Sequence, residues 1–71
     1  SDLNTLPHAL PELSRREKEV LAYLSQGLST SEISQLLFLS INTIQTYRKR
    51  LMEKLEAKNV AELVYKGKSL F

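Results

Sequence analysis

The sequence contains no cysteine, only two glycines and a single histidine, and these absences exclude several classes of protein. Without cysteine there is neither a disulfide framework nor a thiolate metal site. The glycines form no phosphate-binding loop, and His8 lies among prolines in an N-terminal segment. No run of about 18 apolar residues could span a membrane. We therefore expect a soluble, cytoplasmic protein that is not an enzyme and needs no metal or cofactor.

The composition is that of one small globular domain. The chain has 71 residues, of which 42% are hydrophobic and 25% charged. A chain of this length buries only roughly 60% of the surface that it exposes when unfolded, so it has room for a single core. Its net charge of +2 is low, but residues 1–14 carry −2 and residues 45–58 carry +3. The positive charge is therefore concentrated in the second half of the chain.

Four helix-start signals divide the chain. Residues 1–12 contain two prolines and no sustained periodicity, so we interpret them as an arm, with the domain at 13–71. Ser14 with Glu17 forms a capping-box pattern, and Gly27 supplies a left-handed helix end, which predicts a helix over 15–26.

The same pattern returns at Ser29 with Glu32, while Ser40 and Asn59 can each cap a further helix. These signals predict helices over 30–37, 41–55 and 60–68, and no strand pattern competes with them. The fold class is therefore all-α, a four-helix bundle containing a helix-turn-helix.

The middle of the chain has the spacing of a helix-turn-helix. A short helix ends near Leu37, a few residues of turn follow, and a longer helix begins at Ile41. Ser34 is small and would let the two helices approach closely. Any bundle of three or four helices can contain such a corner, so the spacing is suggestive rather than specific.

The predicted helix 41–55 has two chemically different sides. At about 100° per residue, one side carries Ile41, Ile44, Arg48, Leu51, Met52 and Leu55. The opposite side carries Asn42, Gln45, Thr46, Lys49 and Glu53, with Arg50 and Lys54 along one edge. Amide, ammonium and threonine methyl groups can all contact base edges in the major groove. A solvated surface helix carries the same residue types, so composition alone leaves both interpretations open.

Several motifs in order resemble the LuxR-type, or GerE-like, helix-turn-helix domain found at the C-terminus of response regulators of the NarL/FixJ group. They are Leu13-Ser14-x-Arg16-Glu17-x-Glu19-Val20-Leu21, Gly27-Leu28-Ser29-x-x-Glu32-Ile33, Leu39-Ser40-x-x-Thr43-Ile44 and Lys54-Leu55. The resemblance runs from about Leu13 to the C-terminus. It implies the output domain of a bacterial transcriptional regulator that binds double-stranded DNA, with a receiver or other sensory domain elsewhere in a longer protein.

The resemblance also implies roles for particular residues. The helix 41–55 would enter the major groove, with base contacts from Asn42, Gln45, Thr46 and Lys49. Phosphate contacts would come from Ser29, Thr30, Thr43, Tyr47, Arg50 and Lys54. The fourth helix would pair two copies on DNA through Ala61, Val64, Tyr65 and Lys68, and RNA polymerase is a further expected partner.

Three residues depart from the family pattern. Gln45 stands where lysine is frequent, which changes a charged contact into a polar one that could favour adenine. Tyr47 stands where histidine is common and keeps a hydrogen-bonding tip on a larger ring. Glu56 replaces a frequent glycine, so the turn after the third helix must close without a residue that favours positive φ.

Two other functions are compatible with the same fold. A helical protein-interaction module could dock its basic helix on an acidic partner without binding DNA. A sigma factor carries a similar helix-turn-helix that reads promoter DNA.

Overall fold

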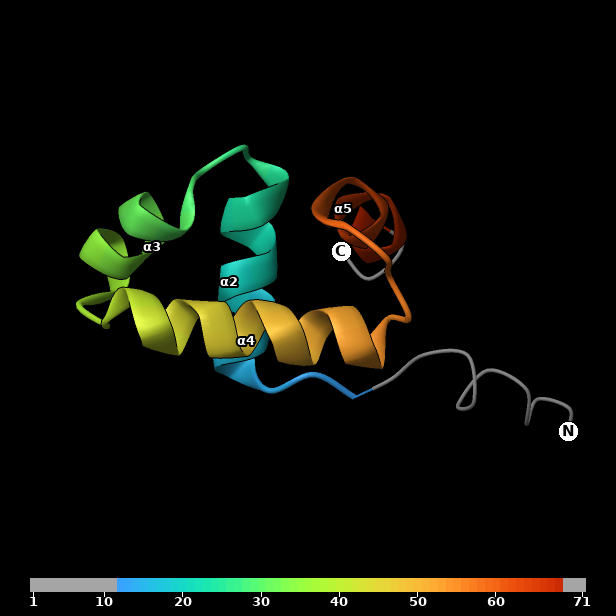
Figure 1. The fold of residues 1–71 in the computed structure, drawn as a ribbon, viewed down its shortest axis with the longest axis horizontal. Coiled ribbons are helices and arrows are strands. Elements are labelled where there is room, and N and C mark those ends of the chain that lie inside the picture. The colour runs from blue at the N-terminus through green and yellow to red at the C-terminus, as the bar shows by residue number, and fades with distance from the viewer. Residues whose placement is uncertain (1–11, 69–71) are drawn as a thin grey trace, which may run out of the picture.

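The computed structural model describes residues 12–68, and all of its regular structure is helical. The helices are α2 (Arg15–Ser25), α3 (Thr30–Leu37), α4 (Ile41–Lys54) and α5 (Val60–Gly67), as Figure 1 shows. Every helix starts at the predicted residue, and α2, α4 and α5 end one residue earlier than predicted. The all-α fold is thus confirmed for the described residues; His8 and residues 1–11 of the predicted arm lie outside them.

The predicted capping residues form the helix starts. The Oγ atoms of Ser14 and Ser29 accept hydrogen bonds from the backbone N–H groups of Glu17 and Glu32, three residues further on. In return, the carboxylates of Glu17 and Glu32 accept hydrogen bonds from the backbone N–H groups of Ser14 and Ser29, each at 2.8 Å. Ser40 Oγ accepts from the N–H of Thr43 at 3.1 Å. These bonds satisfy backbone donors that have no partner inside the helix.

The start of α5 lacks one of the two hydrogen bonds found at the starts of α2 and α3. Asn59 Oδ1 accepts from the N–H of Glu62 at 2.8 Å, as a capping residue should. The Glu62 carboxylate, however, accepts from the N–H of Lys58 rather than from Asn59. The cap is therefore present without the reciprocal bond.

Three helices end in the same left-handed turn, although only one of them has glycine there. The residues with positive φ are Gly27 at 90°, Phe38 at 56° and Glu56 at 54°. In each turn the next residue donates its N–H to a carbonyl five residues back, in the pairs Leu28–Tyr23, Leu39–Ser34 and Ala57–Met52. Glu56 therefore adopts the conformation that glycine would favour, at a cost of about 1–2 kcal/mol for a residue with a Cβ.

The core fixes α4 across the domain. Figure 1 shows α2 crossing behind α4, with α3 beside the N-terminal part of α4 and α5 near its C-terminal end. Contacts join α2 to both α4 and α5, and α3 to α4. The fully buried side chains are Val20, Leu21, Ile33, Ile44, Leu51 and Leu63. Ser34 is also buried, in agreement with its predicted place between α3 and α4.

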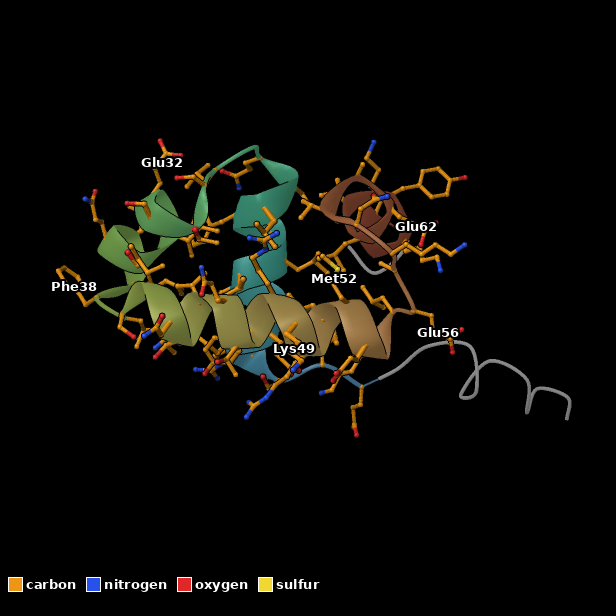
Figure 2. All side chains as sticks on the ribbon, viewed as in Figure 1. Glu32, Phe38, Lys49, Met52, Glu56 and Glu62 are labelled. Carbon is orange, nitrogen blue, oxygen red and sulfur yellow. The ribbon has the colours of Figure 1, made fainter. Side chains whose placement is uncertain are left out.

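Three apolar side chains at the turn between α3 and α4 are exposed. Phe38 is 92% exposed and points away from the body of the domain in Figure 2, and Leu36 and Ile41 are 52% and 44% exposed. Ile41 is therefore exposed, although the sequence pattern places it on the same side of its helix as the buried Ile44 and Leu51. Helical periodicity gives the direction of a side chain around the axis, but not how far along that axis the covering helices extend.

Candidate nucleic-acid interface

One face of α4 is buried and the other is open. Ile44 and Leu51 are fully buried against the other helices, which fixes the rotation of α4 about its axis. The predicted base-contacting residues all lie on the exposed side, and they are Asn42, Gln45, Thr46 and Lys49. Figure 2 shows Lys49 on the outer side of α4. The core therefore holds α4 with this polar face outward.

The polar groups on this face are available to a ligand. Within residues 12–68, the side chains of Gln45, Lys49 and Arg50 make no hydrogen bond or ion pair with the protein. The Thr46 hydroxyl is different, because it donates to the carbonyl of Asn42 at 3.1 Å. The hydroxyl proton is therefore engaged inside the helix, while the methyl group of Thr46 remains open to an outside contact.

The charge of the domain is concentrated on α4. This helix carries Arg48, Lys49, Arg50 and Lys54 against Glu53, a net charge of +3, whereas α3 carries only Glu32. Arg50 is exposed, and Tyr47 is half-buried and packs against the core. A polyanion would therefore be attracted to α4 more than to α3.

The remaining predicted phosphate contacts lie at helix starts. Ser29 is the exposed cap of α3 and Thr30 is its half-buried first residue, so both lie where backbone N–H groups favour an anion. Thr43 lies in the first turn of α4, with its hydroxyl 2.9 Å from that of Ser40. The structure thus places these residues at two helix N-termini, and their phosphate contacts stay a prediction.

Lys54 has partners inside the domain. Its ammonium donates to Glu17 Oε1 at 2.8 Å and to the carbonyl of Glu12 at 3.1 Å, so it joins the end of α4 to the start of α2. Glu17 is only 3% exposed. Burial alone would raise the pKa of Glu17, but the hydrogen bonds from Lys54 and Ser14 and the charge of Lys54 outweigh burial and lower that pKa. Glu17 thus has two roles, the capping role that the sequence predicts and an ion pair with Lys54 that the sequence pattern does not indicate.

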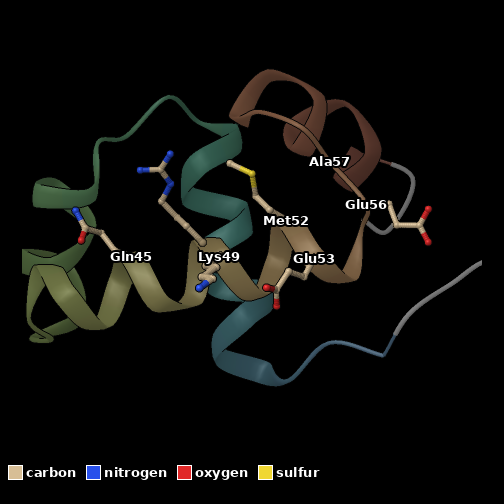
Figure 3. Close-up of a pocket in the computed structure, with 7 residues that line it drawn as sticks. Gln45, Lys49, Met52, Glu53, Glu56 and Ala57 are labelled. Carbon is tan, nitrogen blue, oxygen red and sulfur yellow. The ribbon is translucent and has the colours of Figure 1, made fainter.

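Arg48 lies between the exposed and packed sides of α4. It is half-buried, and its Nε is buried without a hydrogen-bond partner in the described part of the chain. It borders an open groove of about 490 Å³, drawn in Figure 3. The groove is lined by Gln45, Arg48, Lys49, Met52, Glu53, Glu56 and Ala57. One side of α4 thus combines apolar, cationic and anionic groups.

The predicted pairing residues on α5 are only partly free. Ala61, Tyr65 and Lys68 are exposed, with Tyr65 at 76%, while Val64 is half-buried against the core of its own domain. Lys66 donates to the carbonyl of Glu56 at 2.8 Å, which ties α5 to the end of α4. An outside partner would therefore meet mainly Ala61, Tyr65 and Lys68.

Between residues 12 and 68, no three His, Cys, Asp or Glu side chains are grouped so that they could hold a metal ion. In the same range no helix has the length and apolar character needed to cross a membrane.

Comparison with known proteins relates this arrangement to one family. Residues 11–66 match the model of bacterial regulatory proteins of the luxR family. Over 52 residues the chain is 46% identical to BvgA of Bordetella pertussis, a transcription regulator of virulence factors, covering 73% of this chain and 25% of BvgA. Over 54 residues it is 41% identical to the DNA-binding transcriptional activator EvgA of Escherichia coli K12, covering 76% of this chain and 26% of EvgA.

The chain therefore spans about a quarter of the length of these curated relatives. The family match covers α2, α3, α4, the turns between the helices and all but the last residue of α5, and it includes the exposed face of α4. The chain belongs to the luxR family of bacterial regulatory proteins.

Proposed function

We propose that this chain is a sequence-specific DNA-binding domain whose helix α4 enters the major groove. One observation carries the proposal: α4 is held on its inner face by the core and presents unpaired amide and ammonium groups on its outer face. Such groups have little role in the stability of the domain, but they match the donors and acceptors on base edges. The similarity to EvgA, a DNA-binding transcriptional activator, supports the same proposal.

Each exposed side chain suits a particular base. The amides of Asn42 and Gln45 can donate to and accept from adenine, and the Lys49 ammonium can donate to the guanine acceptors. The Thr46 methyl can pack against the thymine methyl, since its hydroxyl is held by the Asn42 carbonyl. The cations Lys49 and Arg50 also attract the phosphate backbone, which adds affinity without specificity.

In vitro selection on random duplexes at moderate salt tests this proposal. We expect one enriched motif, and Gln45→Ala or Lys49→Ala should each reduce discrimination at one position by about 1–3 kcal/mol if the contact is bidentate. The Lys18→Ala variant is the control, because Lys18 is an exposed cation on α2. Recovery of random sequences by the unaltered chain would refute sequence-specific binding and favour a protein-interaction module.

Arg50 should contribute affinity rather than specificity. The Arg50→Ala variant should weaken binding to all duplexes alike. It should also reduce the slope of the logarithm of the binding constant against the logarithm of the salt concentration by about 1, which corresponds to one lost phosphate contact. Fluorescence anisotropy titrations at several salt concentrations would measure both effects. A change confined to one sequence would instead assign Arg50 to base recognition.

We further propose that two copies pair on DNA through α5. The exposed Ala61, Tyr65 and Lys68 support this arrangement, whereas Val64 is partly used by the core of its own domain. A single short helix buries little area, so pairing should depend on a DNA duplex with two half-sites. Sedimentation with such a duplex should give two chains per duplex at saturation, and one chain per duplex would contradict the proposal.

In a longer protein, the domain would act as the cytoplasmic output of a transcriptional regulator. We propose a two-component response regulator whose receiver domain controls access to DNA and which acts on RNA polymerase. The short span of this chain relative to BvgA and EvgA supports a further domain in the complete protein. Sequencing the complete gene tests the domain organisation, since conserved sigma-factor regions in place of a receiver would contradict it.

A further inference from the structure

We infer that Glu53 is an additional specificity-determining residue, which selects cytosine at the end of the DNA site reached by the C-terminal half of α4. The inference rests on the proposed function, because it assumes that α4 lies in the major groove. It assigns a role to a carboxylate on the exposed face of an otherwise basic helix, where an anion would oppose binding to DNA.

Glu53 continues the row formed by two proposed base contacts. Gln45, Lys49 and Glu53 are spaced by four residues, so each side chain is rotated by only about 40° from the previous one and lies about 6 Å further along the axis. All three are exposed and line the same groove, and Figure 3 shows them in succession along α4. A DNA duplex that contacts Lys49 would therefore have Glu53 near its next base pairs.

The carboxylate of Glu53 has no internal function that explains its position. Within residues 12–68 it forms no hydrogen bond or ion pair, although Lys49 is only one turn away. Glu17, Glu32 and Glu62, by contrast, each accept a hydrogen bond from a backbone N–H near a helix start. Glu53 is thus free to accept hydrogen bonds from a ligand.

The chemistry of a carboxylate restricts the base that it can select. An ionised carboxylate only accepts hydrogen bonds, so it cannot pair with the acceptors of guanine or with the thymine O4. The cytosine amino group is a donor that Glu accepts from in the major groove, whereas adenine places an acceptor beside its own amino group. Cytosine is therefore the base that offsets the repulsion between Glu53 and the phosphates.

The spacing also predicts where this cytosine lies. A step of about 6 Å along α4 corresponds to one or two base pairs at about 3.4 Å each. The preferred cytosine should follow the guanine read by Lys49 by one or two steps, on the side away from the base read by Gln45. The neighbouring Glu56 lies beyond the end of α4 and points away from Lys49 in Figure 3, so it should not read a base.

Parallel in vitro selections with the unaltered chain, Glu53→Gln and Glu56→Gln test the inference. The two variants gain the same charge, but only the first loses the proposed contact. We expect Glu53→Gln to reduce the preference for cytosine at one position by roughly fivefold or more, the lower limit for a good base contact. The positions read by Gln45 and Lys49 should be unchanged, and Glu56→Gln should alter no position.

The results separate this inference from the proposed function. A motif that Glu53→Gln leaves unchanged at every position, with tighter binding to all duplexes, would overturn the role of Glu53 and leave DNA recognition by α4 intact. The absence of any motif with the unaltered chain would overturn both. Circular dichroism of Glu53→Gln should show an unaltered fold, because the side chain is exposed and unpaired in the described structure.

Discussion

Replacing Lys54 by methionine should destabilise the domain far more than the same change at an exposed lysine. The variant keeps the apolar stem of the side chain but leaves the Glu17 carboxylate, which is 3% exposed, without its cation. It also removes the hydrogen bond to the carbonyl of Glu12. The start of α2 and the end of α4 would then lose their polar connection.

The magnitude follows from the burial of the two partners. Removing one partner of a fully buried ion pair costs about 3–5 kcal/mol. The Lys54 side chain is 39% exposed, and Glu17 keeps its bond to the N–H of Ser14, so a smaller effect is expected. We expect a loss of about 1–3 kcal/mol, out of a total of about 4–11 kcal/mol for a chain of this length.

Acidification should change the stability of the unaltered domain and that of the Lys54→Met variant in opposite directions. In the unaltered domain the pKa of Glu17 lies below its ordinary value of 4.5. The stabilisation by its charged form is therefore complete above pH 4.5 and is lost as the pH falls through the lowered pKa. In Lys54→Met, burial without the cation should raise the pKa of Glu17, so acidification through that pKa should favour the folded state.

Urea unfolding followed by circular dichroism, at pH 7 and at several values below pH 5, would measure these effects. Lys18→Met is the matched control, since Lys18 is exposed on α2 and should change stability by less than about 0.5 kcal/mol. The double variant Glu17→Gln with Lys54→Met should recover part of the loss, because no buried charge remains. Equal stabilities and equal pH profiles for the two lysine variants would refute the reasoning.

The remaining predictions concern helix ends, packing and base contact. Glu56→Gly should stabilise the domain by up to about 1 kcal/mol in urea unfolding. The free energy gained by removing the left-handed strain should exceed the free energy lost because glycine makes the unfolded chain more flexible. An unchanged free energy of unfolding would show that Glu56 is unstrained. Gly67→Ala should destabilise by about 1–3 kcal/mol, since a Cβ there would meet Leu21 Cδ2 at 2.9 Å in the core; a more stable variant would show that Leu21 can move. Thr46→Val should retain a preference for thymine in selection experiments and Thr46→Ser should lose it, whereas the reverse result would assign recognition to the hydroxyl.

Local signals were enough to predict the helices and the candidate face. Each helix begins where Ser14, Ser29, Ser40 or Asn59 provides a cap, because a cap and its helix lie within three residues of each other. The alternation of apolar and polar residues along 41–54 also predicted which side of α4 would be open. What the open side binds is not a local property, so that conclusion depended on the resemblance to a family.

Other features depended on contacts between distant parts of the chain. Nothing near Lys54 in the sequence indicates that its partner is Glu17, which lies 37 residues earlier. Ile41 is exposed because the helices that cover α4 do not extend as far as its first residue. Glu56 adopts a left-handed φ because the turn after α4 must bring α5 back toward α2.

The sequence by itself thus determined the helices, their starts and the chemistry of each side, because these arise from hydrogen bonds and periodicity over a few residues. Only the tertiary structure decided which polar groups remain unpaired. Lys54 is engaged by a buried carboxylate, while Gln45, Lys49 and Glu53 have no partner among the described residues. The physical reason is that pairing depends on distances between helices, which the packing of the core sets.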